Sequence, residues 1–188
     1  MSEETGEERV CVTGRFQLLH RQHLELLLIG LARGRHLVVG ITNPDPSARR
    51  AVPESEHRHR AGANPFTYFE RLGFVTAALR AEGVAADRFS VVPFPLHQPA
   101  LWEWYVPLGT LQLVRASSAW ERAKAESLGG GYRVEVLSPP GEGRLASSDL
   151  RRILDAGGPW QEAVPAATVP LVEAALSRRP WRERQRDG

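Results

Sequence analysis

The chain has 188 residues, of which 42% are hydrophobic, and its formal net charge is +2 at pH 7. A chain of this length can bury a full core in one domain, so it need not be divided. Its single cysteine, Cys11, excludes an intrachain disulfide and fits a reducing compartment. The sequence has no leader with a charged start and apolar centre, and no apolar run long enough to span a bilayer. We therefore expect a cytoplasmic protein without a membrane partner.

The charges are distributed unevenly along the chain. Residues 1–8 are rich in glutamate and predict a disordered acidic arm, whereas residues 178–188 predict a basic tail. A basic tail can contact nucleic acid, but such tails are more often solvated chain ends, so we expect no nucleic-acid partner. The folded domain is expected over residues 9–177. The sequence leaves the oligomeric state open, a homo-oligomer included, because exposed apolar patches are properties of a surface.

The first predicted strand is Val10–Thr13, a short apolar run that is typical of buried strands. A helix pattern follows, with leucines spaced i, i+3, i+4 and i+7. Two histidines, His20 and His23, therefore lie after a glycine-marked turn, where this helix begins. A helix N-terminus presents unpaired N–H groups and a positive dipole end, which suit a polyphosphate. The alternative is a pair of surface histidines on an amphipathic helix.

The second predicted strand is His36–Ile41, which is apolar enough to be buried on both faces. The connection after it, from Thr42 to Ala63, has no periodicity and is rich in arginine and histidine. A connection of this length is usually functional or disordered. We interpret it as a flap that brings cationic groups to a phosphate-bearing substrate. A solvated insertion that contacts no ligand is an equally weighted alternative.

The rest of the chain continues to alternate between helices and strands. A helix is predicted over Phe66–Leu79, with one face formed by Phe69, Leu72, Thr76 and Leu79. The next strand, Phe89–Val92, is expected to stop at Pro93, because two nearby prolines favour a loop. The remaining elements are strands at 111–114 and 134–137, and helices near 118–128, 148–155, 159–163 and 169–176.

This alternation predicts an α/β fold, namely a single Rossmann-like, doubly wound parallel sheet of five strands with helices on both faces. In such sheets ligands bind beyond the carboxyl ends of the strands, at the switch in strand order. The polar loops after all five strands should therefore meet at one rim. One ligand site is expected there on the topology alone.

The segment Gly14–His23 reads Gly-Arg-Phe-Gln-Leu-Leu-His-Arg-Gln-His and resembles a signature of the nucleotidylyltransferase superfamily. Within that superfamily the chain is most similar to the nicotinamide-mononucleotide adenylyltransferase type. Two further segments, Asn64–Leu72 and Ser147–Arg152, resemble the stretch before the family's second long helix and its late Ser-x-Thr-x-x-Arg signature. The resemblance extends from about Val10 to Leu176.

The resemblance implies transfer of a nucleotidyl group from a nucleoside triphosphate to the phosphate or phosphonate of a small metabolite, with release of pyrophosphate. The attacking oxygen is already anionic at pH 7, so the reaction needs no protein nucleophile and no strong general base. It needs charge relief, in-line positioning and a stabilised leaving group. Mg²⁺ would bridge the triphosphate oxygens with few protein ligands, and we expect no dedicated metal site.

The resemblance also implies roles for individual residues. The expected catalytic residues are His20, His23 and Arg151. The expected nucleotide-binding residues are Gly14, Arg15, Phe16, Gln17, Gln22, Ser147 and Ser148. The expected acceptor-binding residues are Asn43, Arg49, Arg50, Trp102 and Arg115. Trp102 matches a family tryptophan that stacks on the nicotinamide ring, with a buried aromatic packing a loop as the alternative.

The chain departs from the family pattern at several positions. Gln22 stands where a glycine is expected, Ala146 where the late signature has its first serine, and Leu18 where a proline is frequent. An aspartate expected after the third strand is replaced by Phe94-Pro95, and a Ser-Gly-Asn after the fourth strand by Arg115-Ala116-Ser117. These changes fit another acceptor, another base or weakened catalysis.

Two classes of function therefore remain. The first is an enzyme, and its best-supported version is adenylyl transfer from ATP to nicotinamide mononucleotide, forming NAD. A close rival is CTP-dependent cytidylyl transfer to a phosphonate or another phosphorylated metabolite in a specialised pathway. The second class is a nucleotide-binding module without turnover, whose basic tail recruits an anionic partner.

Overall fold

The computed structural model describes residues 6–53, 58–139, 143 and 145–178. Parts of several predicted segments lie outside the described residues: 1–5 of the acidic arm, 54–57 of the flap, 140–142 and 144 of the loop before the late signature, and 179–188 of the basic tail. Among the described helices, none has the length and apolarity that crossing a bilayer requires.

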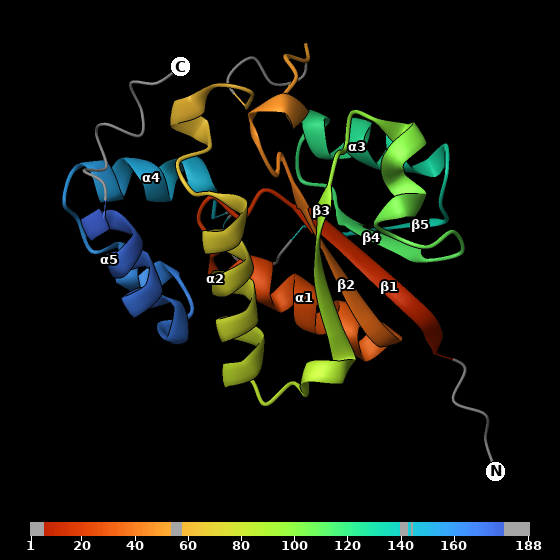
Figure 1. Ribbon diagram of the computed structural model, residues 1–188, viewed down its shortest axis with the longest axis horizontal. Coiled ribbons are helices and arrows are strands. Elements are labelled where there is room, and N and C mark those ends of the chain that lie inside the picture. Colours follow the sequence, from red (N-terminus) through yellow and green to blue (C-terminus); the bar gives the residue numbers. More distant parts are fainter. Residues whose placement is uncertain (1–5, 54–57, 140–142, 144, 179–188) are drawn as a thin grey trace.

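Five parallel strands form one sheet in the order β3-β2-β1-β4-β5, which confirms the predicted fold class (Figure 1). The strands are β1 (Glu7–Gly14), β2 (Gly34–Thr42), β3 (Phe89–Phe94), β4 (Leu111–Arg115) and β5 (Val134–Leu137). From β1 the chain first proceeds through β2 to β3, and then crosses back to place β4 on the other side of β1. The topological switch therefore lies between β1 and β4.

The helices are α1 (Arg21–Arg33), α2 (Tyr68–Ala81), α3 (Ala119–Gly129), α4 (Ser147–Asp155) and α5 (Val169–Arg178). Short 3-10 turns connect them, at Pro46–Ala48, Ala61–Ala63, Ala86–Arg88, Pro99–Trp104, Trp160–Ala163 and Ala166–Thr168. In place of the helix predicted at 159–163, the structure has a four-residue 3-10 turn, Trp160–Ala163, with Pro159 as its N-cap residue.

Two hydrophobic clusters cover opposite faces of the sheet. Val10 and Val12 of β1 pack in the first cluster with side chains of α1, α2 and α5, whereas Cys11 between them packs in the second with side chains of α3. β2 repeats the division, since Leu37 and Val39 belong to the first cluster and Val38 to the second. Successive strand residues point to opposite faces, so both faces are covered by helices.

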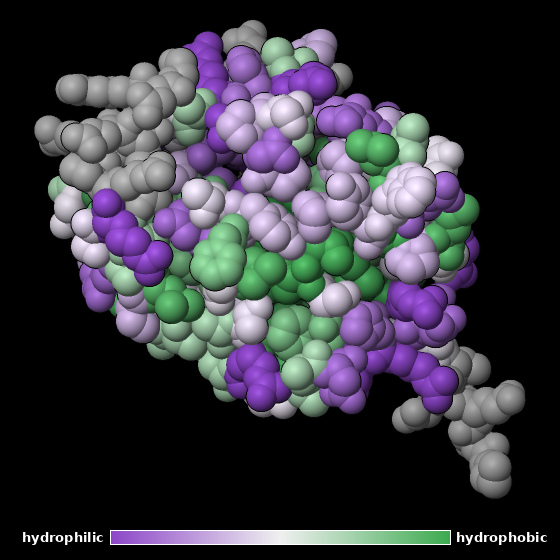
Figure 2. Space-filling model, viewed as in Figure 1, coloured by the Kyte–Doolittle hydropathy of each residue, from purple (hydrophilic) through white to green (hydrophobic). Residues whose placement is uncertain are grey.

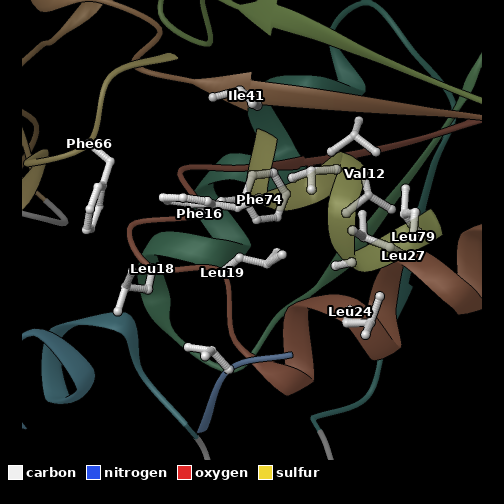
Figure 3. Close-up of a cluster of buried hydrophobic side chains, with 14 of the residues drawn as sticks. Val12, Phe16, Leu18, Leu19, Leu24, Leu27, Ile41, Phe66, Phe74 and Leu79 are labelled. Atoms are coloured by element: carbon white, nitrogen blue, oxygen red, sulfur yellow. The ribbon is translucent and has the colours of Figure 1, made fainter. Parts of the chain in front are cut away.

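The turn between β1 and α1 is anchored in the first cluster. Phe16, Leu18 and Leu19 are each at most 1% exposed, and their side chains point into the core (Figure 3). Phe16 has a φ of 50°, in the left-handed region that non-glycine residues rarely adopt. The apolar side chains therefore hold the polar residues of the same turn in place at the edge of the sheet.

The inward face of α2 differs from the prediction. The helix starts with a capping box between Thr67 and Glu70, and its buried residues are Arg71, Phe74, Val75, Ala78 and Leu79. Phe69 is 77% exposed, so it does not lie on the face that the helix buries. An arginine occupies the inward position of the first turn, and a hydrophobic pattern cannot detect that.

The third strand also extends past its predicted end. Pro93 pairs with Ile41 and Phe94 with Thr42, so β3 includes the proline that was expected to stop it. β3 is the edge strand, where a missing N–H costs no ladder hydrogen bond if it faces outward.

Figure 2 shows hydrophobic side chains gathered across the middle of the face on which α2 and β3 lie in Figure 1.

The N-terminal strand begins earlier than expected. β1 starts at Glu7, so Glu7 and Glu8, which the prediction placed in the acidic arm, belong to the sheet. Glu7 pairs with Gly34 of β2, and its carboxylate accepts a hydrogen bond from Arg133. These contacts replace the disorder that a run of glutamates predicts.

Candidate functional site

A cleft of about 470 Å³ opens at the carboxyl edge of the sheet. One wall consists of the end of β1, the start of α1, and residues 145–148 at the start of α4. The opposite wall consists of Arg115 at the end of β4 and the first turns of α3, and Arg58 of the flap also lines the cleft. The cleft therefore lies at the topological switch between β1 and β4, where the sequence predicted a ligand site.

His20 and His23 stack on each other where α1 begins. Their ring centroids are 3.6 Å apart, with an angle of 19° between the planes, and Phe16 packs edge-on against His23 at 5.1 Å. The main-chain N–H of His20 donates to Nδ1 of His23 at 3.4 Å. A neutral His23 therefore carries its proton on Nε2, which can donate to an anion in the cleft.

The electrostatic surroundings keep His23 neutral. Burial, followed by Coulombic interactions with His20 and Lys124, holds the pKa of His23 well below its usual range. Arg15 lies beside it, and its Nη1 donates to the main-chain oxygen of Ala63 at 3.1 Å. Burial and the nearby guanidinium of Arg58 lower the pKa of Arg15. Positive groups concentrate at this end of the cleft, which suits a polyanionic ligand.

The start of α4 lies against the turn between β1 and α1. Ser147 Oγ donates to the carbonyl oxygen of Leu18 at 3.1 Å, and Arg151 Nη1 donates to that of Gln17. Ala146 is the N-cap residue of α4 and has no side chain that can cap the helix. The N-termini of α1 and α4 therefore both contribute to one cleft, although the two segments are far apart in the sequence.

Gln22, which replaces the expected glycine, joins α1 to the segment before α4. Its Nε2 donates to the carbonyl oxygen of Gly143 at 2.9 Å, and its Oε1 accepts from the N–H of Leu145 at 2.9 Å. Both ends of the amide are thus bonded to main chain. The side chain therefore connects the two helix N-termini that line the cleft.

Arg71 organises the main chain behind the site. It is 1% exposed and donates to the carbonyl oxygens of Arg15, Thr42, Asn43, Pro44 and Thr67, at 2.8–3.3 Å. Burial lowers its pKa to about 10. One guanidinium therefore ties together the turns that follow β1 and β2, because its planar fork can serve several acceptors at once.

The opposite wall carries Trp120, Glu121 and Lys124 of α3. Lys124 Nζ donates to the carbonyl oxygen of Thr13 at 2.9 Å, at the end of β1. Glu121 Oε2 accepts from the N–H of Ser117 at 2.7 Å. Residues one helical turn apart share a face, so α3 presents an aromatic, an acidic and a basic group to the cleft.

The flap reaches the cleft through Arg58. Its guanidinium carbon lies 4.9 Å from the ring centroid of Trp120, a cation–π contact between the flap and α3. The Arg58 carbonyl oxygen accepts hydrogen bonds from Arg15, Asn43 and Asn64. Its backbone is thereby fixed while its side chain extends over the far wall.

Several polar atoms in the cleft wall have no partner among the described residues. Thr13 Oγ1, Arg15 Nε and Arg115 Nε are buried without a hydrogen bond. Unsatisfied buried polar groups are uncommon in native proteins. Three of them around one cleft indicate a place where a bound ligand supplies the missing partners.

The described residues contain no cluster of three or more acidic, histidine or cysteine side chains that could hold a metal ion. Glu121 is the acidic residue in the cleft wall, and its carboxylate accepts hydrogen bonds from Ser117 and Ser118. The donor set fits a divalent ion that arrives with phosphate oxygens as its main ligands.

The structure brings most of the predicted site residues together. Those in the cleft wall are Gly14, Arg15, Phe16, His20, Gln22, His23, Arg115, Ser147 and Ser148. Arg151 lies behind this wall, because it is 7% exposed and bonded to Gln17. Gln17 is 0% exposed, and its amide makes two hydrogen bonds of 2.8 Å with the main chain of Phe66. Both therefore hold the turn that carries His20.

Trp102 does not reach the cleft. It is 4% exposed in the second cluster, and its ring stacks on Phe94 and Tyr132 at centroid distances of 5.7 and 5.8 Å. This position matches the alternative that the sequence offered, a buried aromatic that packs a loop. The loop that carries it follows the edge strand β3, two strands away from the switch.

The other predicted acceptor residues belong to the flap and lie outside the cleft wall. Nδ2 of Asn43 donates to the main-chain oxygen of Arg58 and to Oδ1 of Asn64. Arg50 donates to the main-chain oxygens of Ser47 and Arg49. Arg49 lies near Asp45, and burial lowers its pKa. Asn43 and Arg50 thus bond within the flap or to its immediate neighbour, and among the flap residues that the structure describes, Arg58 lines the cleft.

Trp120, Lys124 and Arg71 have site contacts that were not predicted, and Arg58 was expected only as one of several cations of the flap. Trp120 and Lys124 are four residues apart at the start of the helix after the fourth strand, and this spacing, which places both on one face of the helix, is the signal that could have identified them. Arg58 was hidden in a basic connection, and Arg71 in an amphipathic helix.

Comparisons with known proteins agree with this geometry. The chain is 37% identical over 174 residues to a phosphonoformate cytidylyltransferase from Streptomyces viridochromogenes, a match that covers 92% of this chain and 95% of the relative. It is 28% identical over 180 residues to a nicotinamide-nucleotide adenylyltransferase from Ignicoccus hospitalis, covering 91% and 95%. No protein-family model matches the chain.

Among solved structures, the chain resembles a bifunctional NMN adenylyltransferase/ADP ribose pyrophosphatase from Francisella tularensis, complexed with AMP and a manganese ion. The TM-score is 0.67 at 12% sequence identity, over 95% of this chain and 52% of that protein. The chain thus spans about half the length of that structure. This likeness supports the Rossmann-like fold described above.

Proposed function

This chain belongs to the nucleotidylyltransferase superfamily, and from that premise we propose that it transfers a cytidylyl group from CTP to a small phosphonate, with release of pyrophosphate. The observation that carries the proposal is the cleft at the topological switch, where two helix N-termini face a second wall with its own cations. The 37%-identical cytidylyltransferase supports the choice of CTP and a phosphonate.

The wall of α1 and α4 is the proposed site of the triphosphate. His20 and His23 lie at a helix start, Arg15 is beside them, and Ser147 and Ser148 open α4. Helix N-termini bind phosphates through main-chain N–H groups and the dipole. Arg151 and Gln17 act as positioning residues, because they hold the turn that carries the histidines.

The chemistry needs little from the protein beyond placement and charge. A phosphonate oxygen forms a bond to the α-phosphorus of the triphosphate, the bond from that phosphorus to the bridging oxygen breaks, and pyrophosphate leaves. Nε2–H of His23 and the guanidinium of Arg15 are placed to stabilise the charge that builds up on the phosphate oxygens. No general base is required, since the attacking oxygen is already anionic.

Mg²⁺ is the proposed cofactor, and it would arrive bound to the triphosphate. It supplies charge neutralisation between phosphate oxygens. The lack of an acidic cluster among the described residues fits this mode of binding. Glu121 would contribute an outer contact at most, because its carboxylate already accepts two hydrogen bonds.

The cleft favours an acceptor without an aromatic ring. Trp102, the expected stacking partner of nicotinamide, is buried between two other rings. The guanidinium of Arg58 lies over Trp120, the tryptophan of the cleft wall. A small anion fits these surroundings better than a nicotinamide ring does.

Adenylyl transfer from ATP to nicotinamide mononucleotide is the second candidate. It is supported by the 28%-identical adenylyltransferase, which covers nearly the same part of the chain. In that case Arg58 would have to move away from Trp120 to open an aromatic surface.

Pyrophosphate release separates these candidates. The purified protein is incubated with Mg²⁺ and each of four pairs, made from CTP or ATP with phosphonoformate or nicotinamide mononucleotide. We expect the fastest release with CTP and phosphonoformate. Faster release with ATP and nicotinamide mononucleotide would establish the second candidate instead. No release with any pair, while CTP still raises the melting temperature, would indicate a binding module without turnover.

A further inference from the structure

Lys124 places a positive charge in the cleft that the described residues do not neutralise by a direct contact. Its hydrogen-bond acceptor is the carbonyl oxygen of Thr13, a neutral group, at 2.9 Å. An ammonium group has three donors, so two remain for a ligand. Thr13 Oγ1, on the same residue, is buried and has no partner among the described residues.

The groups around Lys124 supply only part of a counter-charge. Glu121 lies one turn earlier, but its carboxylate accepts from Ser117 at 2.7 Å and from Ser118 at 3.1 Å. Burial lowers the pKa of Lys124 to about 8, partly offset by Glu121, and the charge of Arg58 lowers it further. The amine is still mostly protonated at pH 7, so a partly buried cation is left without a full counter-charge.

The position of Lys124 assigns it to the acceptor side. It extends from α3, which packs in the second cluster, whereas α1 packs in the first, on the other face of the sheet. The triphosphate site proposed above lies on the α1 and α4 wall. The guanidinium of Arg58 lies over the ring of Trp120, so this wall offers two cations beside that ring.

We propose that Lys124 is a specificity-determining residue, which binds a second acidic group, a carboxylate, on a small phosphonate acceptor. The inference rests on the proposed function for the identity of the acceptor. The phosphonate oxygen would face the triphosphate, while the carboxylate would accept from Nζ of Lys124, with Arg58 beside it. Selection would come from the cost of leaving the ammonium unpaired when the acceptor lacks the second charge.

The test compares two ligands and three proteins. The ligands are phosphonoformate and its carboxylate methyl ester, which keeps the phosphonate but removes the second charge. The proteins are the wild type, Lys124→Met, and Arg122→Met, a control that removes an exposed cation from the same helix. Calorimetry measures the dissociation constant of each ligand, and pyrophosphate release with CTP and Mg²⁺ measures turnover separately.

We expect the wild type and Arg122→Met to bind phosphonoformate about 10- to 100-fold more tightly than the ester, as one charge-assisted hydrogen bond predicts. Lys124→Met should lose this preference while the KM for CTP changes less than about threefold. Equal binding of both ligands by the wild type would overturn the inference, whether or not the variant folds. A preference that survives in Lys124→Met, or a loss confined to CTP, would also overturn it.

The proposed function can fail separately. If the wild type prefers phosphonoformate to its ester and Lys124→Met loses that preference, but pyrophosphate is released only with another pair, the recognition by Lys124 is supported and the cytidylyl transfer is refuted. If turnover with CTP and phosphonoformate is fast and the ester reacts equally well, the proposed reaction is supported and the proposed role of Lys124 is refuted.

Discussion

The two walls of the cleft are built in different ways. The wall of α1 and α4 is held by side chains bonded to main chain, such as Gln22 to Leu145 and Ser147 to Leu18. In the other wall, the described contact between α3 and the flap is the one in which the side chain of Arg58 lies over Trp120. The first wall is therefore fixed by hydrogen bonds between side chains and main chain, whereas this part of the second depends on the identity of two side chains.

This difference between the walls corresponds to the difference between the triphosphate donor, which every nucleotidyl transfer uses, and the acceptor, which varies. Every nucleotidyl transfer must hold a triphosphate in line, so the fixed wall suits the donor. Acceptors differ in size and charge, and side chains can change without disturbing the backbone of the sheet. The comparison predicts that changes in the fixed wall impair all acceptors, while changes in the other wall alter the choice among them.

The largest expected effect belongs to His23→Ala. We expect turnover to fall about 10²–10³-fold, as for loss of one charge-stabilising donor, and equally for every acceptor. Pyrophosphate release measures the rate, and circular dichroism checks the fold. His36→Ala is a matched control, because His36 lies at the other end of the sheet with Asp87 and Ser90. A rate loss limited to one acceptor would break the comparison.

Arg151→Ala tests whether a residue behind the fixed wall acts through position. Removing the guanidinium leaves the buried carbonyl of Gln17 without this donor, so we expect the free energy of unfolding to fall by about 1–3 kcal/mol. Misplacement of the histidine turn should lower turnover by up to about 10²-fold. Urea unfolding and pyrophosphate release are the measurements. Arg151→Lys should recover part of the stability, and a rate loss with unchanged stability would instead mark a direct contact with substrate.

Gln22→Ala should have a smaller effect. Two hydrogen bonds to the segment before α4 are lost, at about 1 kcal/mol each, so we expect a loss of about 1–2 kcal/mol in stability and a few-fold rise in the KM for CTP. Arg21→Ala, an exposed residue of the same turn, serves as the control. Unchanged stability would show that this side chain does not hold the two helix N-termini together.

The smallest expected effect is a pH dependence of stability due to Lys124. The pKa of Lys124 in the folded protein is about 8, below the usual lysine value of 10.5, so between these values the unfolded chain binds more protons. Stability contributed by this residue should therefore rise as pH increases from 8 to 10. Cys11 acts in the opposite direction, because burial raises its thiol pKa from 9.0 to about 12.

The difference between wild type and Lys124→Met isolates this effect, because both proteins contain Cys11. We expect the free energy of unfolding of the wild type, minus that of the variant, to increase as pH rises from 8 to 10. Urea titrations at three pH values measure the gap. A constant gap would mean that the ammonium is not shielded from solvent in the folded protein.

The sequence was most informative where chemistry and local structure coincide. The turn after Val10–Thr13, the histidines at the helix start and the serines of the late signature all lie in the cleft as predicted. Their positions follow from strand, turn and helix signals that are close in sequence. The position of Trp102 could not be predicted from a single aromatic match, because such a match does not show where in the sheet the strand before its loop lies. Lys124 and Arg71 were missed because a cation in a helix is usually at the surface.

The order of polar and apolar residues was thus sufficient to predict the alternating strands and helices and the edge of the sheet at which the cleft lies. Those features depend on periodicity and turn chemistry, which act over a few residues. The tertiary structure alone decided which residues face that motif across the cleft. Arg58, Trp120 and Lys124 come together because the chain crosses back over β1 to build β4 and α3. Such a meeting depends on packing between distant segments, for which a single sequence carries no local signal.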